Sequence, residues 1–424
     1  MVWLTITKKG KIKSKLSQRI LLVNTFHFYG GGDSTYTFNL AELLRSQGHT
    51  VAFFAMQDER NLSDPDSDLF VSNIDFRNMN KQRGIVNGAR VLKRVIYSRE
   101  ARQKFSQIIN RFSPDVIHLQ NIMGHISPSI ILEARKRKIP VVWTLHDYKL
   151  ICPNTHFLID TTGEICEACN GGRYYQPVLK RCKKGSLLAS SMASLEAYAH
   201  RFMKVREQID AFITPSRFLR ARLITEGFNP TQVHYLPHFL SENLFQATSK
   251  NENYMLFLGR LTPIKGIYTL LEASQMVPDI RILLAGRIEE PLKSTMTEIM
   301  PDNVEYMGIV HGEELRHLLV NSTALVMPSL WYENQPFSIL EAFACEKPVI
   351  ASDLGGMKEL VVHLERGILV PPADASALAE AMLSIAESPQ EVSRMGANAR
   401  EYAVAHHHPN VHYHRLMDIY AQVV

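Results

Sequence analysis

Apolar residues in the first half of the chain form short, nearly continuous runs, and segments with helical spacing lie between them. Such runs are typical of strands buried on both faces of a parallel sheet. The predicted strands are Arg19–Thr25, Thr50–Met56, Asp115–Gln120, Pro140–Asp147 and Ala211–Ser216. The predicted helices are Ser34–Gln47, Val86–Phe112 and Ile126–Lys138. This alternation predicts a doubly wound α/β domain.

The second half repeats the alternation. Its predicted strands are Tyr254–Arg260, Ile280–Ala285, Val304–Met307, Ala324–Met327, Pro348–Ser352 and Gly367–Val370. Its predicted helices are Gly266–Val277, Glu313–Asn321, Phe337–Cys345 and Ala375–Glu387. The pattern therefore predicts two Rossmann-like domains, with ligands beyond the carboxyl ends of the strands, in a cleft between the domains. We place these domains at 1–236 and 237–405, with a polar linker near Pro237–Asn253 and a final helix, 406–424, that packs back on the N-terminal domain.

Composition narrows the class of protein. Of the 424 residues, 46% are hydrophobic and 21% are charged, as in soluble globular proteins. No run approaches the ~18 apolar residues of a membrane-spanning helix. The chain has five cysteines, a small and odd number that does not fit the disulfide framework of a secreted protein. The N-terminal segment contains lysines where a signal peptide would have apolar residues. We expect a cytoplasmic protein.

The net charge of +5 is unevenly distributed. Residues 1–236 carry a balance of +15 and the remaining residues a balance of −10. This asymmetry suggests two domains that face different partners. The basic half is suited to nucleic acid, anionic lipid or a phosphorylated acceptor, and solvated surface charge is the alternative.

A glycine-rich turn is the first candidate for chemistry. Gly30, Gly31 and Gly32 follow the first predicted strand and precede a helix. Glycines let a ligand approach the backbone, and free N–H groups at a helix N-terminus attract an anion. The spacing matches neither the dinucleotide fingerprint nor the phosphate loop of nucleotide hydrolases. A tight turn without a ligand is the alternative.

Two further motifs lie in the second half. Arg260 and Lys265 stand on a loop that opens a helix, where two cations can hold a diphosphate from two sides. Seven residues separate Glu333 from Glu341, and Pro336 suits the first turn of the helix between them. Amides at that helix N-terminus can meet an anion, and Glu341 can accept hydrogen bonds from sugar hydroxyls. Solvated charge is the alternative for both pairs.

Together the three motifs resemble the retaining GT-B glycosyltransferases of glycosyltransferase family 4, also called group 1. In that family an E-x7-E motif, an R-x4-K pair and an N-lobe glycine loop bind a nucleotide-sugar. The segments KPVIASDLGGMKELV and ERGILVPPADASALAEAM are also similar to the family. The resemblance covers nearly the whole chain and implies the GT-B fold, with two Rossmann-like doubly wound domains facing a cleft.

The resemblance also implies roles for single residues. The residues implied to bind the donor are Gly31, Gly32, Arg260, Lys265, Asn334, Phe337, Ser338 and Glu341. Of these, Arg260 and Lys265 would hold the diphosphate of a UDP- or GDP-sugar, and Glu341 the ribose. Glu333 would contact the donor sugar and is our first catalytic candidate. Catalysis would need no cofactor.

Two histidines are candidates on the acceptor side. His146 lies at the carboxyl end of a predicted strand, where parallel sheets place their ligands, and we prefer it to His118 as the catalytic histidine. Retaining transfer needs no strong enzymatic base, because the departing phosphate can take the acceptor proton. Orientation of the sugar is therefore as open a role for His146 as proton transfer, and a structural histidine is the alternative.

Four of the five cysteines, Cys152, Cys166, Cys169 and Cys182, fall in a short insert at about 152–184. Thiolates at this density suggest a structural zinc site, with an iron–sulfur cluster or reduced thiols as alternatives. The D-x-D at Asp64–Asp66 lies in a polar loop, so we predict an exposed turn and assign no catalytic metal.

Basic side chains are dense between Lys81 and Arg111 and in an arm from Lys8 to Lys15, and apolar residues such as Phe105 accompany them. This pattern predicts docking on the inner face of an anionic membrane, where lipid-linked sugar acceptors reside. The alternative is that the apolar residues form a core face. Aromatic residues do not interleave with the basic run, so nucleic acid is not a predicted partner.

The sequence thus predicts a retaining hexosyltransferase that moves a sugar from a nucleoside-diphosphate sugar to a saccharide acceptor, free or lipid-linked, in surface-polysaccharide synthesis. A nucleotide-sugar epimerase with the same fold, or a non-catalytic polysaccharide-assembly scaffold, are the alternatives. The complete set of Arg260, Lys265, Glu333 and Glu341 argues against a scaffold, which needs no diphosphate site.

Overall fold

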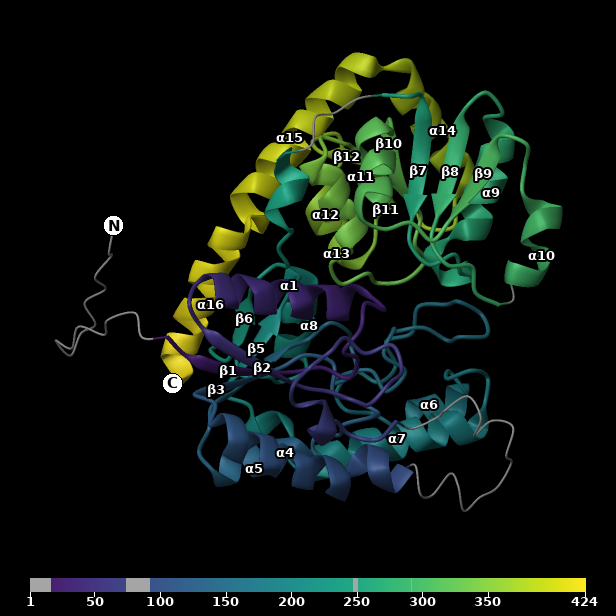
Figure 1. The fold of residues 1–424 in the computed structure, drawn as a ribbon. Coiled ribbons are helices and arrows are strands. Elements are labelled where there is room, and N and C mark those ends of the chain that lie inside the picture. Colours follow the sequence, from purple (N-terminus) through teal and green to yellow (C-terminus); the bar gives the residue numbers. More distant parts are fainter. Residues whose placement is uncertain (1–16, 74–91, 247–250, 291) are drawn as a thin grey trace. The chain divides into compact units, whose positions relative to one another are not determined.

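The computed structural model describes residues 17–73, 92–246, 251–290 and 292–424 (Figure 1). Contacts divide the chain into two compact units. The first unit comprises Met1–Thr144, Lys204–Ala211 and Ile419–Val424, and the second comprises Leu145–Met203 and Phe212–Asp418.

The first sheet has six strands in the order β2-β1-β3-β4-β5-β6. Its strands are β1 (Arg19–Val23), β2 (Thr50–Phe54), β3 (Val116–Leu119), β4 (Val141–Thr144), β5 (Ala211–Thr214) and β6 (Val233–Tyr235). The pairs β1–β2, β1–β3, β3–β4 and β5–β6 are parallel. Residues 20–23 of β1 and all of β3, β4 and β5 are buried, which explains their continuous apolar runs.

The second sheet has six strands in the order β12-β11-β10-β7-β8-β9, and its neighbouring strands are parallel. Its strands are β7 (Tyr254–Leu258), β8 (Arg281–Ala285), β9 (Val304–Gly308), β10 (Ala324–Met327), β11 (Val349–Ser352) and β12 (Gly367–Val370). Alternate residues of β7 enter two different cores, Met255 and Phe257 on one face and Tyr254 and Leu256 on the other.

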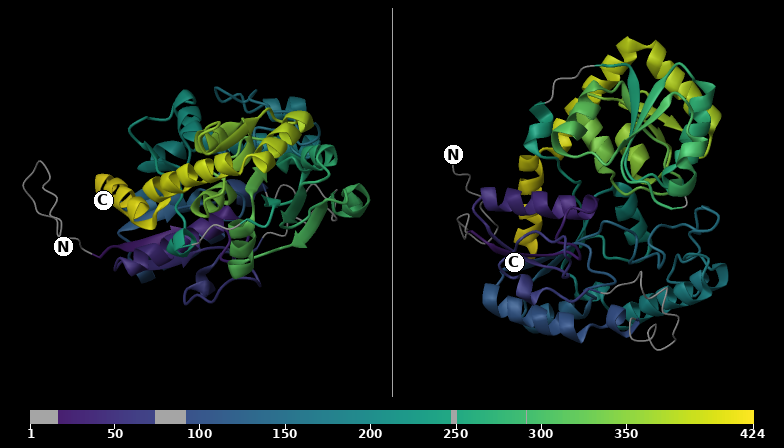
Figure 2. Two further views of the ribbon diagram at one scale, coloured as in Figure 1. Left: turned by 90° about the horizontal axis from the view of Figure 1, so that it is seen from above. Right: turned by 45° about the vertical axis from the view of Figure 1, so that its right-hand side comes forward.

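Helices flank both sheets. Those with lengths of at least seven residues are α1 (Gly32–Ser46), α4 (Arg99–Phe112), α5 (Ser129–Lys136), α7 (Leu187–Phe202), α8 (Arg217–Thr225), α9 (Ile267–Met276), α10 (Leu292–Ile299), α11 (Gly312–Asn321), α12 (Phe337–Ala344), α13 (Gly355–Val361), α14 (Ala375–Glu387), α15 (Pro389–His407) and α16 (Pro409–Val423). In the second unit, α9 and α14 cover one face of the sheet and α11, α12 and α13 the other (Figure 2).

These elements confirm the predicted fold class of two doubly wound parallel sheets. Strands β10 and β12 and helix α14 have the predicted bounds. The change of sheet, between Tyr235 and Tyr254, falls in the predicted linker. The sequence interpretation had no counterpart for β6, α6 (Gln176–Lys180), α7, α8, α10, α13 or α15. The domain limits themselves stay a prediction, and Ile419–Val424 belongs to the first unit.

Helix α4 begins at Arg99, and the first six residues of the helix predicted over Val86–Phe112 lie outside the described residues. Ser98 is its N-cap, and the Ser98 side chain accepts a hydrogen bond from the Ala101 amide at 3.1 Å. A helix runs over residues 92–96 before this cap. The chain therefore breaks between two helical stretches, where the periodicity predicted one.

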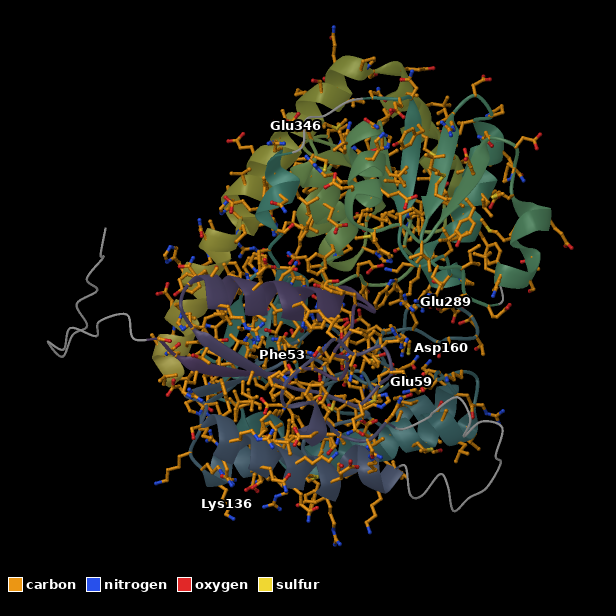
Figure 3. The ribbon with its side chains drawn as sticks, in the orientation of Figure 1. Phe53, Glu59, Lys136, Asp160, Glu289 and Glu346 are labelled. Carbon is orange, nitrogen blue, oxygen red and sulfur yellow. The ribbon has the colours of Figure 1, made fainter. Side chains whose placement is uncertain are left out.

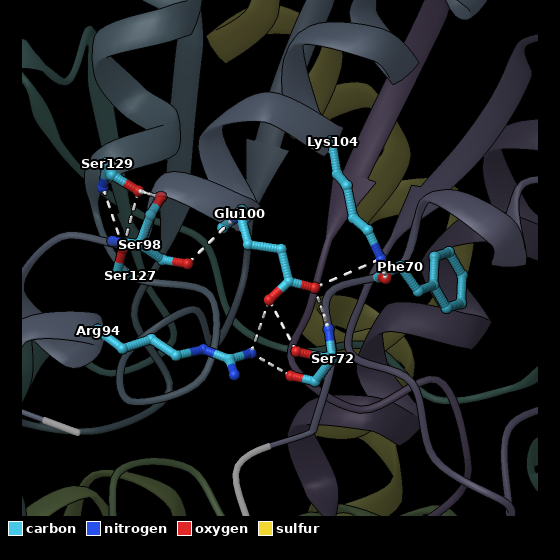
Figure 4. A network of polar contacts seen from close by, with 9 residues as sticks. Phe70, Ser72, Arg94, Ser98, Glu100, Lys104, Ser127 and Ser129 are labelled. Atoms are coloured by element: carbon cyan, nitrogen blue, oxygen red, sulfur yellow. Dashed lines mark hydrogen bonds and ion pairs between the residues drawn. The ribbon is translucent and has the colours of Figure 1, made fainter. Parts of the chain in front are cut away.

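The apolar side of α4 is its core face, because Phe105 and Ile108 are fully buried. Two cations of this region are paired within the first unit: the Glu100 carboxylate lies 3.4 Å from Arg94, which precedes α4, and 3.4 Å from Lys104 (Figure 4). For the described part of the basic stretch between Lys81 and Arg111, the apolar residues thus form a core face, which is the alternative that the sequence analysis left open. Lys8–Lys15, Lys81, Arg83 and Arg90 lie outside the described residues.

The acidic loop is also held by internal contacts. Arg111 forms ion pairs with Asp66 at 2.9 Å and with Asp68 at 3.0 Å, and the Asp66 amide donates to Asp64 at 2.9 Å. Within the ranges of the chain that the structure describes, no helix has the length and apolar character needed to cross a membrane.

Candidate functional site

The loop after β7 carries the two predicted donor-binding cations. A short turn, η4 (Pro263–Lys265), leads from this loop into α9. Gly266 ends the turn with φ of +75°, and a Cβ atom there would lie 1.8 Å from the carbonyl oxygen of Pro328. Only glycine therefore allows the turn to approach the loop that follows β10. The Leu330 amide joins the two loops by donating to the Ile264 carbonyl at 2.9 Å.

This approach brings Lys265 to Glu333. The Lys265 ammonium donates to Glu333 Oε1 at 2.5 Å, and both side chains are largely buried. Ser329 Oγ donates to the same oxygen at 2.8 Å, and the Trp331 indole N–H does so at 2.7 Å. We call Arg260, Lys265, Ser329, Trp331 and Glu333 the donor cluster. Three hydrogen-bond donors fix one carboxylate oxygen, so Lys265, Ser329, Trp331 and Glu333 are held in place before any ligand binds.

Arg260 has a different environment. Its side chain is 52% exposed, and its guanidinium lies 3.5 Å from the carboxylate of Glu289, which is labelled in Figure 3. A contact of this length between exposed groups stabilises a fold little. The guanidinium can therefore turn toward an anionic ligand without a large cost to the fold.

The backbone around Glu333 depends on a second close approach by glycine. Gly356 follows β11 and lies in the first turn of α13, and a Cβ atom there would lie 1.8 Å from the Asn334 carbonyl oxygen. The Gly356 amide donates to the Glu333 carbonyl at 2.8 Å. The family-like segment with Gly355 and Gly356 therefore supports the loop that carries Glu333, a role the sequence analysis did not assign.

The side chains after Glu333 anchor the loop within the second unit. Asn334 accepts from Ser216 Oγ at 2.6 Å and donates to the Leu145 carbonyl at 3.0 Å. Gln335 accepts from the His238 amide at 2.5 Å. These contacts orient the Asn334 side chain, which keeps a second N–H for the predicted contact with the donor.

Helix α12 starts at Phe337 without a side-chain cap on its first amides. The Phe337 ring stacks on His238 at 5.1 Å with an interplanar angle of 7°, and the Ser338 hydroxyl points to the Met327 sulfur at 3.8 Å. Uncapped N–H groups at a helix start favour an anion. Contacts of Asn334, Phe337 and Ser338 with a donor stay a prediction.

Glu341 lies one turn into α12. Protein atoms surround its carboxylate densely although the residue keeps some accessible surface, and this burial raises the pKa of Glu341 to about 7. The neighbouring Cys345 is fully buried. A carboxyl group held neutral by its surroundings gains most from a ligand that donates hydrogen bonds to its charged form. The hydroxyl groups of a ribose are donors of this kind.

The two candidate histidines have contrasting surroundings. His118 is fully buried in the first unit, where Tyr420 bonds its Nδ1 at 2.7 Å and Thr144 its Nε2 at 2.8 Å. Both ring nitrogens are thereby occupied. His146 is partly exposed in the second unit and stacks at 5.2 Å on His238, the ring that also stacks on Phe337. This placement favours His146 over His118 as a site residue, and its catalytic role stays a prediction.

His238 was not predicted as a site residue. Burial first, and then neighbouring histidines including His146, hold its pKa well below the usual range. The ring is therefore uncharged at physiological pH, and it lies stacked between His146 and Phe337. The sequence analysis did not identify His238, because this residue lies in the predicted linker Pro237–Asn253 and belongs to no motif.

The glycine turn belongs to the first unit. Gly31 is the N-cap of α1 and has an extended backbone, and Gly30, Gly31 and Gly32 are exposed. Ser34 Oγ lies 3.3 Å from the Gly30 amide and 3.3 Å from the Gly31 carbonyl. The turn thus presents exposed backbone at a helix start, which suits the predicted phosphate contact.

The cysteine-rich insert contacts the donor loop. Tyr332 donates to Glu167 at 2.9 Å, and the His156 ring meets the Trp331 ring at 5.0 Å. Glu167 also pairs with Arg222. The insert therefore supports the two residues that precede Glu333.

The four cysteines of the insert are free thiols, and three of them are buried. Burial first, and then the nearby Cys152 and Cys166, raise the pKa of Cys182 to about 11. Among the described residues, no three His, Cys, Asp or Glu side chains are placed as a metal-binding group. Zinc at this insert stays a prediction, which metal analysis of protein prepared with reduced thiols and without chelators would decide.

Comparison with known proteins matches the chain to two families. Residues 30–243 match the family described as Glycosyltransferase Family 4, and residues 241–402 match the family described as Glycosyl transferases group 1. An uncharacterized protein of the cps region of Klebsiella pneumoniae is 24% identical over 80% of this chain and 87% of its own length. The D-rhamnosyltransferase WbpZ of Pseudomonas aeruginosa is 28% identical over 54% of this chain and 57% of its own length.

Solved structures show the same fold across the whole chain. Sucrose-phosphate synthase from Thermosynechococcus elongatus superposes with a TM-score of 0.68 at 20% identity, over 96% of this chain and 99% of that one. The Anabaena protein HepE in complex with UDP-glucose gives a TM-score of 0.63 at 15% identity, over 95% of this chain and 98% of that one. These structures have the GT-B fold, as the sequence predicts for this chain.

Proposed function

This chain belongs to glycosyltransferase family 4, and we propose that it is a retaining enzyme that transfers a sugar from a nucleoside-diphosphate sugar to a saccharide acceptor. Glycosyl transfer in glycan synthesis follows from the family. The observation that carries the finer proposal is the contact between Lys265 and Glu333, fixed by Ser329 and Trp331 beside the uncapped start of α12.

In this proposal the donor cluster binds the diphosphate. Lys265 uses one N–H for Glu333 and has two more for phosphate oxygens. Arg260 adds a second cation, which stabilises the charge of the departing nucleotide. The amides at the start of α12 complete the anion site.

Two carboxylates then orient the donor. The hydrogen bonds from Lys265, Ser329 and Trp331 all end on Glu333 Oε1. We assign Glu333 Oε2 to a hydroxyl of the donor sugar and Glu341 to the ribose. His146 orients the sugars, and the departing phosphate takes the acceptor proton. HepE binds UDP and UDP-glucose, which supports a uridine nucleotide as the first donor to test.

Product stereochemistry tests this function. The full chain is incubated with a nucleoside-diphosphate sugar and saccharide acceptors, and the anomeric proton of the product is followed by NMR. We expect transfer with the anomeric configuration of the donor. Inverted product would contradict the retaining mechanism. Conversion of the donor sugar to an epimer without acceptor would show the alternative activity instead.

A further inference from the structure

Helix α7 packs against the rest of the second unit mainly through polar residues. Its buried residues are Ser190, Ala193, Ser194, Glu196 and His200. Its large apolar residues are exposed, with Phe202 at 90%, Leu188 at 69% and Leu195 at 54%. A surface helix of a globular protein normally shows the opposite arrangement.

Polar contacts hold the inner side of α7 in place. The Glu196 carboxylate pairs with Lys149 at 2.7 Å, and both side chains are nearly fully buried. Ser190 Oγ accepts from the Lys183 amide at 3.2 Å, and Ser186 caps the helix by accepting from Ala189. A rotation that buried the apolar side would break this buried ion pair, so the exposed apolar side is fixed by the fold.

The exposed apolar residues form one stripe. Leu188, Leu195 and Phe202 are seven residues apart, and Tyr198 lies between the last two on the same side of the helix. The short helix α6 packs against α7 and adds Leu179, which is 70% exposed, while Tyr174 contacts Tyr198 at 5.5 Å. We call the side made by Leu179, Leu187, Leu188, Leu195, Tyr198 and Phe202 the α7 face. Monomeric soluble proteins rarely expose a contiguous surface of this kind without a partner.

The charged residues next to the α7 face indicate the chemistry of its partner. The segment 173–203 contains six Lys and Arg residues and one acidic residue, the buried Glu196. Arg173, Lys180, Arg181, Lys184 and Arg201 are exposed. Apolar residues with two aromatic rings and a basic border match the acyl boundary and phosphate layer of an anionic bilayer.

We propose that the α7 face docks this protein on an anionic membrane surface. The leucines and Phe202 enter the outer acyl region, and the lysines and arginines contact lipid phosphates. The docking places the enzyme where lipid-linked acceptors reside, and in that sense it deepens the proposed function. It relocates the docking surface from the α4 region, whose apolar side is core and whose Arg94, Arg102, Lys104 and Arg111 are engaged in ion pairs.

Vesicle binding tests the proposal. The full chain is sedimented with vesicles of phosphatidylcholine and phosphatidylglycerol in equal parts and with vesicles of phosphatidylcholine alone, and neither contains saccharide. We expect salt-sensitive binding to the anionic vesicles only. The triple variant Leu188→Ser, Leu195→Ser, Phe202→Ser should bind at least about tenfold more weakly. The matched control Ile309→Ser, Leu364→Ser, Leu383→Ser removes exposed apolar side chains elsewhere and should bind like the native protein.

Lysine acetylation of the native protein gives a readout without any variant. Anionic vesicles should protect Lys180 and Lys184, while Lys358, which is also exposed, stays reactive. Unchanged vesicle binding by the α7 triple variant would overturn the proposal. Protection of Lys180 and Lys184 before vesicles are added would also overturn it, and light scattering would then show whether a second copy covers the face. Because the vesicles carry no acceptor, failure here leaves glycosyl transfer untouched.

Discussion

The donor cluster and the α7 face are the two parts of the second unit to which we assign proposed binding roles, and they differ in how they are built. In the donor cluster, the charged groups of Lys265 and Glu333 are largely buried in a fixed hydrogen-bonded set, and only Arg260 is exposed. The α7 face exposes apolar groups over a helix held by a buried ion pair. A compact polar ligand needs hydrogen-bonding groups that are already in position, whereas a bilayer needs a broad apolar surface with cations at its border.

This contrast predicts opposite responses to substitution. Truncating the buried Lys265 should affect both the ligand and the fold, because the Glu333 charge then stays buried without its cation, whereas truncating the exposed Arg260 should affect the ligand alone. Truncating a member of the α7 face should leave the isolated fold nearly unchanged, because these side chains are exposed in the chain itself.

The largest effect is expected for Lys265→Ala. This variant leaves the Glu333 carboxylate buried without its cation, so the free energy of unfolding should fall by about 3–5 kcal/mol. Binding of a nucleoside diphosphate should also be lost. Urea denaturation and calorimetry measure the two effects. As a matched control, Arg281→Ala breaks an ion pair to Glu305 whose two members are each 53% exposed, and should cost at most about 1 kcal/mol. Equal stability of both variants would contradict the role of Lys265.

Arg260→Ala should separate binding from stability. Its side chain is half exposed and contacts Glu289 only at 3.5 Å, so the unfolding transition should stay within about 0.5 kcal/mol of the native one. Loss of a charge-assisted contact should weaken nucleoside-diphosphate binding by about 1.5–3 kcal/mol. Calorimetry that found native affinity in Arg260→Ala would remove this residue from the donor site.

Glu341 should make donor binding depend on pH. With its pKa at about 7, the free carboxyl is mostly neutral at about pH 6 and ionised at about pH 8. Ribose hydroxyls donate to the ionised form, so nucleoside-diphosphate affinity should rise up to about tenfold over this range. Glu341→Gln should lose that rise and keep only the part due to phosphate ionisation. Identical pH profiles for the two proteins would exclude a role of Glu341 in ribose binding.

The same raised pKa has a consequence for folding. The unfolded chain binds the proton of Glu341 less tightly than the folded chain does, so folding is favoured where the carboxyl is neutral. Ionisation between about pH 4.5 and 7 therefore lowers stability. Glu341→Gln should reduce that part of the pH dependence of the unfolding free energy.

The smallest effect is expected on the α7 face. Phe202→Ala should change the unfolding free energy by at most about 0.5 kcal/mol, because the ring is 90% exposed. Phe105→Ala on α4 removes a ring that is fully buried and should cost about 3–5 kcal/mol. Denaturation of the two variants under the same conditions compares the helices directly. A large cost for Phe202→Ala would mean that the chain itself covers the α7 face.

The second sheet and most residues of the donor cluster could be predicted from the sequence. Its strands are continuous apolar runs, its cations and glutamates have fixed spacing, and β10, β12 and α14 have the predicted bounds. What could not be predicted depends on loops distant in the chain. Trp331, Ser329 and Gly356 take their roles from the approach of η4 and α13, which no local spacing encodes.

The α7 face could not be predicted for a different reason. The sequence interpretation assigned no helix to residues 187–202, and helical periodicity by itself shows that a helix has two sides but not which side is buried. On α4 the usual assignment holds, with Phe105 inside. On α7 a buried pair of Glu196 with Lys149 reverses it, and this pair joins residues 47 positions apart. The ion pair with the distant Lys149 thus determines which side of α7 faces the protein.

The most direct test of the central claim, that the donor cluster binds a nucleoside diphosphate, is a thermal-shift panel on the full chain. Nucleoside mono- and diphosphates and their sugars are compared for their effect on the unfolding midpoint. Because a ligand that binds the folded state stabilises it, one diphosphate series should raise the midpoint more than its monophosphate, and Arg260→Ala should lose that difference. A panel without any stabilising diphosphate, or an equal shift in Arg260→Ala, would contradict the account.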